Sequence, residues 1–259
     1  FVTCLADMMR PRAAAAALRL LRAAGVTVDV PAGQTCCGQP AWNAGADDVA
    51  AALVRAMLPL FEPFDAIVVP SASCAGMIMR HWPRALAADG TWRGRAEALA
   101  GRTFELCEFL HLREAEPLAG RWRFGPVAFH ESCSLRRETG DVEAPRALLR
   151  RIPGLRLVEM DDPAACCGFG GLFSVELPEV SVHLADRRIA TLEATGAPIL
   201  TGVDAGCLMH LSGRLSRRGL PHAVFHVAEI LAGAVAEGDR GFSGIATRET
   251  AASDAGEGA

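Results

Sequence analysis

The chain has 259 residues and a formal net charge of −4 at pH 7, and 51% of its residues are hydrophobic. This length is enough for one large or two small domains, and the lack of a basic excess argues against nucleic acid as a partner. No apolar run reaches the roughly 18 residues of a membrane span, and no signal peptide is recognisable, so we expect no membrane span and a cytoplasmic protein with reduced cysteines.

The first half of the sequence alternates predicted strands and helices. An apolar strand at 1–4, which we expect a few further residues to precede, is followed by a helix within 11–25 and a β-branched strand at 26–30. A CCG loop at 36–38, a helix over 46–61, a buried strand at 65–70 and a turn at 71–74 before another helix come next.

The second half repeats this order. It reads as a strand at 126–133, a helix at 144–151, a strand at 155–160, the loop CCGFGG at 166–171, a helix at 179–194 and a strand at 198–203. The turn DAGC and a strand at 222–227 precede a helix that runs to about 236, and we predict a disordered tail over 238–259.

Alternating strands and helices predict the α/β class, here as two similar parallel-sheet lobes with helices on the faces of the sheets. The predicted domains are residues 1–122 and 123–237, each a cysteine-rich unit of one repeat.

The cysteines repeat with the same period. Between the first cysteine and an adjacent pair lie 31 residues, and 36 more precede the next cysteine; the second half has 32 and 39. The cysteines that follow this repeat are Cys4, Cys36, Cys37, Cys74, Cys133, Cys166, Cys167 and Cys207. The ninth, Cys107 in the apolar run TFELCEFL, has no counterpart, and we interpret it as a small buried hydrophobic residue.

The repeated cysteines are candidate ligands of a metal centre. Each position follows a predicted strand, and the carboxyl ends of parallel strands share one sheet edge, where helix N-termini favour thiolates. Four thiolates hold zinc or an iron–sulfur cluster. Structural zinc usually uses C-x-x-C knuckles, which neither half contains, whereas adjacent thiolates can reach different iron atoms. The spacing therefore favours an iron–sulfur cluster, with zinc as the alternative.

Two histidines flank the second set of cysteines. His130 lies three residues before Cys133, and His210 lies three residues after Cys207. Each is either a hydrogen-bond donor or proton carrier beside the second centre, or an ordinary histidine satisfied by backbone. We interpret the pairs Arg136–Arg137 and Arg187–Arg188 as solvated helix faces.

The cysteine order C-x₃₁-CCG-x₃₅-C, repeated as C-x₃₂-CCG-x₃₈-C, resembles the twin cysteine-rich CCG domain that heterodisulfide reductase shares with the iron–sulfur component of glycolate oxidase. The motifs FVTCLADM, TCCGQPAWNAG, PSASCAGMI, HESC, CCGFGGLFSV and GCLMH resemble more closely the lactate-utilisation protein A family, a bacterial (Fe–S)-binding group. The resemblance covers residues 1–236.

This resemblance implies an electron-transfer subunit of an L-lactate oxidation complex that converts lactate to pyruvate. Its implied partners are a ferredoxin-like iron–sulfur subunit and a third small subunit, and its implied cofactor is an iron–sulfur cluster of the 4Fe–4S kind. The eight repeated cysteines would hold it, four to each site.

The sequence departs from the heterodisulfide reductase pattern at two positions. Each CCG motif of that relative ends in C-x-x-C, whereas here Ser71 and Asp204 stand in place of the first cysteine of that pair. We predict that Ser71 caps the helix that follows it, and Asp204 is either an oxygen ligand or a hydrogen-bond acceptor.

Two other functions stay open. The cysteines could hold zinc in an assembly subunit without a redox role, or the chain could be a thiol/disulfide reductase of the heterodisulfide reductase type. The sequence shows no flavin or nicotinamide fingerprint and no evident base for lactate oxidation. We therefore expect an oxidoreductase subunit that needs its partners.

Overall fold

The computed structural model describes residues 1–236 and 238–242, and within them every pairing between strands is parallel. The first half contains a two-stranded sheet of β1 (Ile67–Val69) and β2 (Thr103–Glu105). The second half contains a four-stranded sheet in the order β4-β3-β5-β6, made of β3 (Val127–His130), β4 (Leu157–Glu159), β5 (Ile199–Gly202) and β6 (Ala223–His226). The predicted α/β class with two parallel sheets is confirmed.

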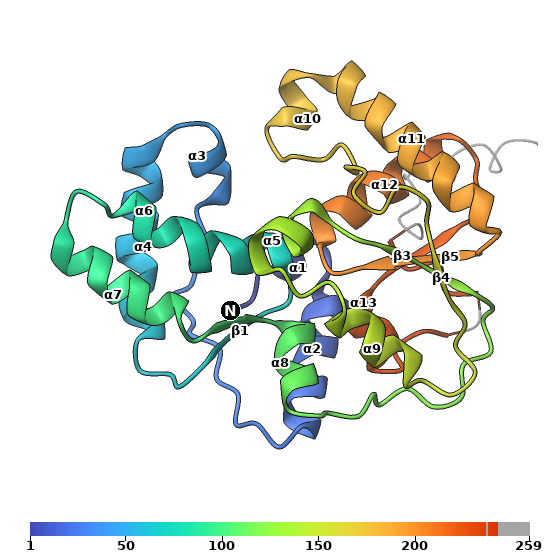
Figure 1. Cartoon of the computed structure of the whole chain (residues 1–259), viewed down its shortest axis with the longest axis horizontal. Coiled ribbons are helices and arrows are strands. Elements are labelled where there is room, and N and C mark those ends of the chain that lie inside the picture. Colours follow the sequence, from blue (N-terminus) through green and yellow to red (C-terminus); the bar gives the residue numbers. More distant parts are fainter. Residues whose placement is uncertain (237, 243–259) are drawn as a thin grey trace, which may run out of the picture.

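Helices surround both sheets (Figure 1). Those of the first half are α1 (Cys4–Met9), α2 (Pro11–Ala23), α3 (Gln39–Asn43), α4 (Asp47–Phe61), α5 (Ala72–Gly76), the π-helical turn η1 (Met77–His81), α6 (Trp82–Ala85), α7 (Gly90–Ala100) and α8 (Leu106–Leu112). Those of the second half are the π-helical turn η2 (Leu135–Thr139), α9 (Ala144–Arg150), α10 (Phe173–Glu176), α11 (Pro178–Thr195), α12 (Ala205–Arg217) and α13 (Val227–Leu231). No helix in the described part of the chain is long and apolar enough to span a bilayer.

Two predicted strands of the first half are absent from the described residues. The Thr3 hydroxyl accepts a hydrogen bond from the Ala6 N–H at 3.2 Å, so Thr3 is the N-cap of α1. A helix therefore begins where a strand was expected. Residues 26–30 line an apolar cavity of about 110 Å³ together with β1 and α2, and they form no ladder. β-branched residues favour a strand only where a hydrogen-bonded neighbour is in place. The short strand β2 was not predicted.

The repeat extends to the caps of two helices. Glu105 ends β2 and caps α8 in a capping box with Glu108. His226 ends β6 and caps α13 in a capping box with Glu229. Equivalent strand-to-helix turns therefore occupy equivalent places in the two halves, although the side chains that cap them differ.

One hydrophobic core joins the halves. It contains Leu20 of α2 and Leu106 of α8 from the first half together with Phe129 of β3 and Ile230 of α13 from the second. The buried residues of two further cores come from a single half each, from residues 37–99 in one and 128–242 in the other, although Leu5 packs against the second. The shared core fixes the two halves side by side, and the predicted boundary between domains near residue 122 stays a prediction.

Order extends a short way into the predicted tail. Arg12 donates a hydrogen bond to the Asp239 carboxylate at 2.6 Å, Gly241 forms an isolated parallel bridge with Val224, and Phe242 is buried beneath the guanidinium of Arg10. Residues 238–242 therefore pack against the body of the protein where the sequence predicts disorder. The remainder of the predicted tail, 243–259, lies outside the described residues.

Candidate metal centre

The eight repeated cysteines line one cavity of about 280 Å³ at the junction of the two halves. Both cysteine-bearing loops and the starts of α1, α5 and α12 contribute to its wall. The sequence predicts one site on each sheet edge. The structure brings both groups to a single space, because the shared core turns the two edges toward each other. We call the cysteines of the first half the first quartet and those of the second half the second quartet.

The first quartet is built from a helix start, a loop and a short helix. Cys4 begins α1, and its Sγ lies 3.9 Å from the Sγ of Cys36. Cys37 pairs instead with Cys74 of α5, with 3.4 Å between their sulfurs. The indole of the fully buried Trp82 donates a hydrogen bond to the Cys37 carbonyl at 2.8 Å and so anchors the loop. Adjacent cysteines therefore turn toward different partners.

The loop of the second quartet depends on a glycine. Gly168 has a φ of 88°, and a Cβ at this position would lie 2.3 Å from the Ser181 carbonyl oxygen. Its N–H donates to the Cys166 sulfur at 3.3 Å, and the next N–H, from Phe169, donates to the Cys167 sulfur at 3.4 Å. Because only glycine adopts this conformation without strain, Gly168 allows its own N–H and that of Phe169 to point at the sulfurs.

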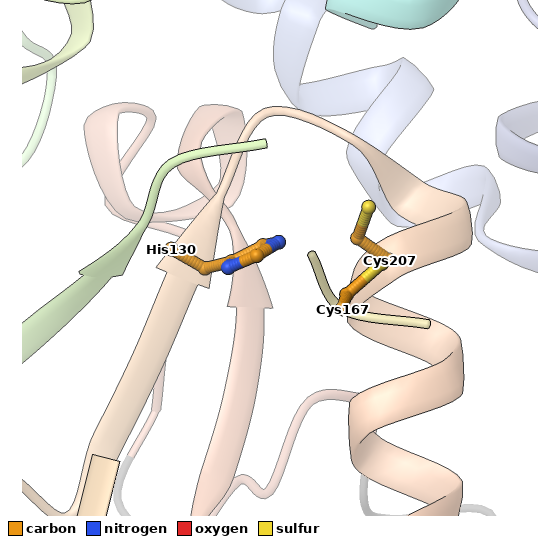
Figure 2. Close-up of side chains that lie close together, drawn as sticks. All are labelled: His130, Cys167 and Cys207. Carbon is orange, nitrogen blue, oxygen red and sulfur yellow. The ribbon is translucent and has the colours of Figure 1, made fainter. Parts of the chain in front are cut away.

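His130 points at the second quartet from the end of β3 (Figure 2). One of its ring nitrogens and the sulfurs of Cys167 and Cys207 all lie within 4.8 Å of one another. His210, the other candidate, lies within 3.2 Å of the Ser181 hydroxyl and beside the Phe169 ring. The structure thus brings His130 to the sulfurs and places His210 against Ser181 and the Phe169 ring.

In each quartet, the thiol of the first cysteine of the adjacent pair has a lowered pKa. Hydrogen bonds from the Cys37 and Cys4 thiols lower the pKa of Cys36. Hydrogen bonds from its neighbouring thiols lower the pKa of Cys166 in the same way. Hydrogen bonding to Cys36 and burial raise the pKa of Cys4, so the sulfurs oppose one another's ionisation. A bound cation relieves this repulsion, which is the behaviour of a metal-binding cluster of thiols.

The two positions that depart from the heterodisulfide reductase pattern meet at the junction. The Ser71 hydroxyl donates to a carboxylate oxygen of Asp204 at 2.7 Å, and the Ser73 N–H donates to the same oxygen at 2.9 Å. The other carboxylate oxygen accepts a hydrogen bond from Ser132. Ser71 also accepts from the Cys74 N–H, which confirms its predicted role as a cap. Of the two alternatives for Asp204, the structure shows the acceptor.

Two other interpretations have clear outcomes. Cys107 is fully buried in the shared core, as predicted. The interpretation of Arg188 as part of a solvated helix face is wrong, because its side chain is 1% exposed and hydrogen-bonds to His130. An isolated arginine pair on a helix carries no signal that separates a solvated side chain from a buried one. Its neighbour Arg187 is exposed, as expected.

Comparison with known proteins supports the repeat. Residues 1–79 and 127–212 match the model of a family described as "Cysteine-rich domain" (CCG), and all eight cavity cysteines lie within these two segments.

Several curated proteins resemble the chain over most of its length. A "Lactate utilization protein A" of Geobacillus sp. (strain WCH70) is 40% identical over 232 residues, which cover 89% of this chain and 97% of the relative. One of Exiguobacterium sp. (strain ATCC BAA-1283 / AT1b) is 42% identical over 234 residues, with 89% and 95% covered. A "Lactate utilization protein A 1" of Bacillus anthracis (strain CDC 684 / NRRL 3495) is 39% identical over 237 residues, with 90% and 96% covered. The chain therefore belongs to the cysteine-rich CCG family, among the proteins named lactate utilization protein A.

Proposed function

We propose that this protein is an iron–sulfur electron-transfer subunit of a lactate-utilisation complex, in which lactate is oxidised to pyruvate. The observation that carries the proposal is the convergence of eight cysteine sulfurs on one cavity. The names of its relatives supply the lactate context. All nine cysteines are free thiols, which suits the reducing cytoplasm as the proposed setting.

The donor set suits clusters with several metal atoms. Soft thiolate ligands select iron–sulfur clusters, zinc or copper(I). Cys36 and Cys37 are adjacent in sequence yet face different sulfurs, those of Cys4 and Cys74. One tetrahedral ion has no need of that arrangement, whereas a cluster offers separate iron atoms to the two thiolates. The cysteines of each quartet would hold the cluster, which when bound supplies electron transfer.

The chain's own residues orient and shield the centre. Backbone N–H groups of Gly168 and Phe169 donate to sulfurs of the second quartet, and Trp82 holds the first loop in place. Such hydrogen bonds and limited solvent access tune the potential of thiolate-bound iron.

Oxidation of lactate itself calls for partner subunits. Asp204 is the one carboxylate among the described residues that line the cavity, and Ser71, Ser73 and Ser132 already donate to it. Three donors already occupy its two oxygens, so this carboxylate is not free to take a proton from lactate. We propose a ferredoxin-like iron–sulfur subunit and a third small subunit as the partners that complete the reaction.

Zinc is the second candidate, and the grouping of His130, Cys167 and Cys207 is the observation in its favour. A zinc-bound chain would be an assembly subunit without a redox role.

Metal analysis and an absorption spectrum of protein purified without oxygen test the proposal. The proposed function predicts iron and acid-labile sulfide in similar amounts and a broad visible absorption that dithionite bleaches. Zinc without sulfide, with a spectrum that does not respond to reductant, would show that the chain is a zinc-bound assembly subunit without a redox role.

A further inference from the structure

We propose that His130 is a hydrogen-bond donor to the second quartet rather than a metal ligand, that Arg188 fixes it in this role, and that the second centre is therefore the more easily reduced of the two. This inference rests on the proposed function.

The position of His130 allows either role. Its side chain is 1% exposed, and its ring points from the end of β3 toward the sulfurs of Cys167 and Cys207 (Figure 2). One ring nitrogen, Nδ1, lies 3.1 Å from the Nε of Arg188. The other, Nε2, is buried and has no hydrogen-bond partner among the described residues. A buried polar atom without a partner is costly, so Nε2 is the atom whose partner decides the role.

Arg188 determines which ring nitrogen carries the proton. A guanidinium only donates hydrogen bonds, so Nδ1 of His130 must accept and has no proton. The neutral ring then carries its proton on Nε2, on the side of the sulfurs. Because Nδ1 accepts from Arg188, it has no room for a second proton, and the ring stays neutral.

This arrangement is the opposite of what a metal ligand needs. A histidine that binds a metal usually donates its other N–H to a carboxylate or a carbonyl oxygen. In His130 that other nitrogen accepts from a cation, and binding a metal through Nε2 would require an imidazolate. A donor to a thiolate needs only the proton that Nε2 already holds.

Arg188 is itself held firmly behind the loop of the second quartet. Its side chain is 1% exposed, and one terminal nitrogen donates to the carbonyl oxygens of Asp161 and Asp162 at 3.0 and 2.9 Å. Among the described residues it forms no ion pair with a carboxylate. Its charge, which also acts on the Cys167 thiol, polarises the His130 ring toward the sulfurs.

The first quartet has no histidine at the equivalent position among the described residues. The residue three positions before Cys133 is His130, and the residue three positions before Cys4 is Phe1, whose ring packs against Phe61. Hydrogen bonds to sulfur and a nearby positive charge stabilise the reduced, more negative form of a thiolate-bound cluster. The two centres therefore differ in reduction potential, and electrons reside first on the second.

Redox titration of reconstituted protein, followed by electron paramagnetic resonance, tests the inference in three variants. His130→Phe copies the first half, His130→Gln keeps an N–H donor, and Arg188→Met removes the residue that orients the ring. We expect His130→Phe to retain its iron and to lower the equilibrium constant for reduction of the second centre at least tenfold, about 59 mV for one electron. His130→Gln recovers part of this loss, Arg188→Met lies between, and the first centre does not change.

Three results would overturn the inference. Loss of iron from the second quartet in His130→Phe, with an unchanged circular dichroism spectrum, would show that His130 is a metal ligand. An unshifted reduction potential in His130→Phe would show that His130 does not stabilise the reduced second centre. The proposed iron–sulfur function would be unaffected by this result. Wild-type protein without iron and sulfide would refute the proposed function, and the inference with it.

Discussion

Ser71 and Asp204 are 133 positions apart in the sequence, yet the hydroxyl of one donates to the carboxylate of the other at 2.7 Å. Each stands three residues before the last cysteine of its quartet. The hydrogen bond therefore joins the two halves of the repeat at the point where their cysteine sites meet. With Ser73 and Ser132 it forms a small buried polar network in the wall of the cavity.

Removal of Asp204 should weaken the junction. Asp204→Ala leaves the donors of Ser71, Ser73 and Ser132 without their acceptor, and we expect the free energy of unfolding to fall by about 2–4 kcal/mol. Urea denaturation measures this change. Asp186→Ala is the control, because the Asp186 carboxylate is 36% exposed and its ion pair with Arg214 is worth at most about 1 kcal/mol. Equal denaturation midpoints for the two variants would contradict the role of the network.

Gly168 should be irreplaceable in the second loop. Gly168→Ala combines a φ of 88° with a 2.3 Å contact to the Ser181 carbonyl, so we expect iron at the second quartet to be lost. Gly140→Ala is the matched control, since Gly140 has a φ of 87° and nothing within 4 Å of its added Cβ. The control should cost only the strain of the left-handed backbone, about 1–2 kcal/mol. Iron analysis of both variants separates the clash from the strain, and full iron in Gly168→Ala would disprove the role of the loop.

Trp82 should matter for the first quartet alone. Trp82→Phe removes the hydrogen bond to the Cys37 carbonyl from a fully buried site, and we expect it to lower the free energy of unfolding by about 1–3 kcal/mol. The iron bound by the first quartet should fall because the loop loses its anchor. Trp92→Phe, on α7 and away from the cavity wall, is the control. A loss confined to the second quartet would count against this explanation.

Stability should decrease from pH 5 to pH 8 because of Glu105. Burial raises the pKa of this carboxyl group to about 8 from an ordinary value of 4.5, so the folded state binds a proton that the unfolded state releases. The stabilisation is complete below pH 4.5 and is lost as the pH rises to 8, at up to about 1.4 kcal/mol per pH unit.

Glu105→Gln tests this pH dependence. It keeps an acceptor for the Cys107 and Glu108 N–H groups and cannot ionise, so its free energy of unfolding should vary less over this range. Denaturant titrations at each pH measure the slope, with Glu116→Gln on the exposed surface as control. Parallel curves for wild type and Glu105→Gln would assign the pH dependence to another group.

Much of the site could be predicted because cysteine spacing is a local signal. The spacing identified the eight cysteines that line the cavity, and apolar periodicity located long helices such as α4 and α11 to within a residue or two. The predicted strand at 26–30 was wrong, because alternating β-branched residues carry no information about whether a neighbouring strand is present. Contacts between the two halves could not be predicted from the sequence for a related reason. The junction of Ser71 with Asp204 and the burial of Arg188 depend on how two distant segments pack.

We propose that each quartet holds its own iron–sulfur centre. Iron and acid-labile sulfide per chain, measured without oxygen in Cys36→Ser, Cys166→Ser and the double variant, test it most directly. Cys107→Ser is the control, because Cys107 is a buried cysteine in the shared core and lies away from the cavity. We expect each single variant to lose the iron of one centre, the double variant to lose both, and Cys107→Ser to keep the wild-type amount. Wild-type iron and sulfide in Cys36→Ser and Cys166→Ser alike would contradict it.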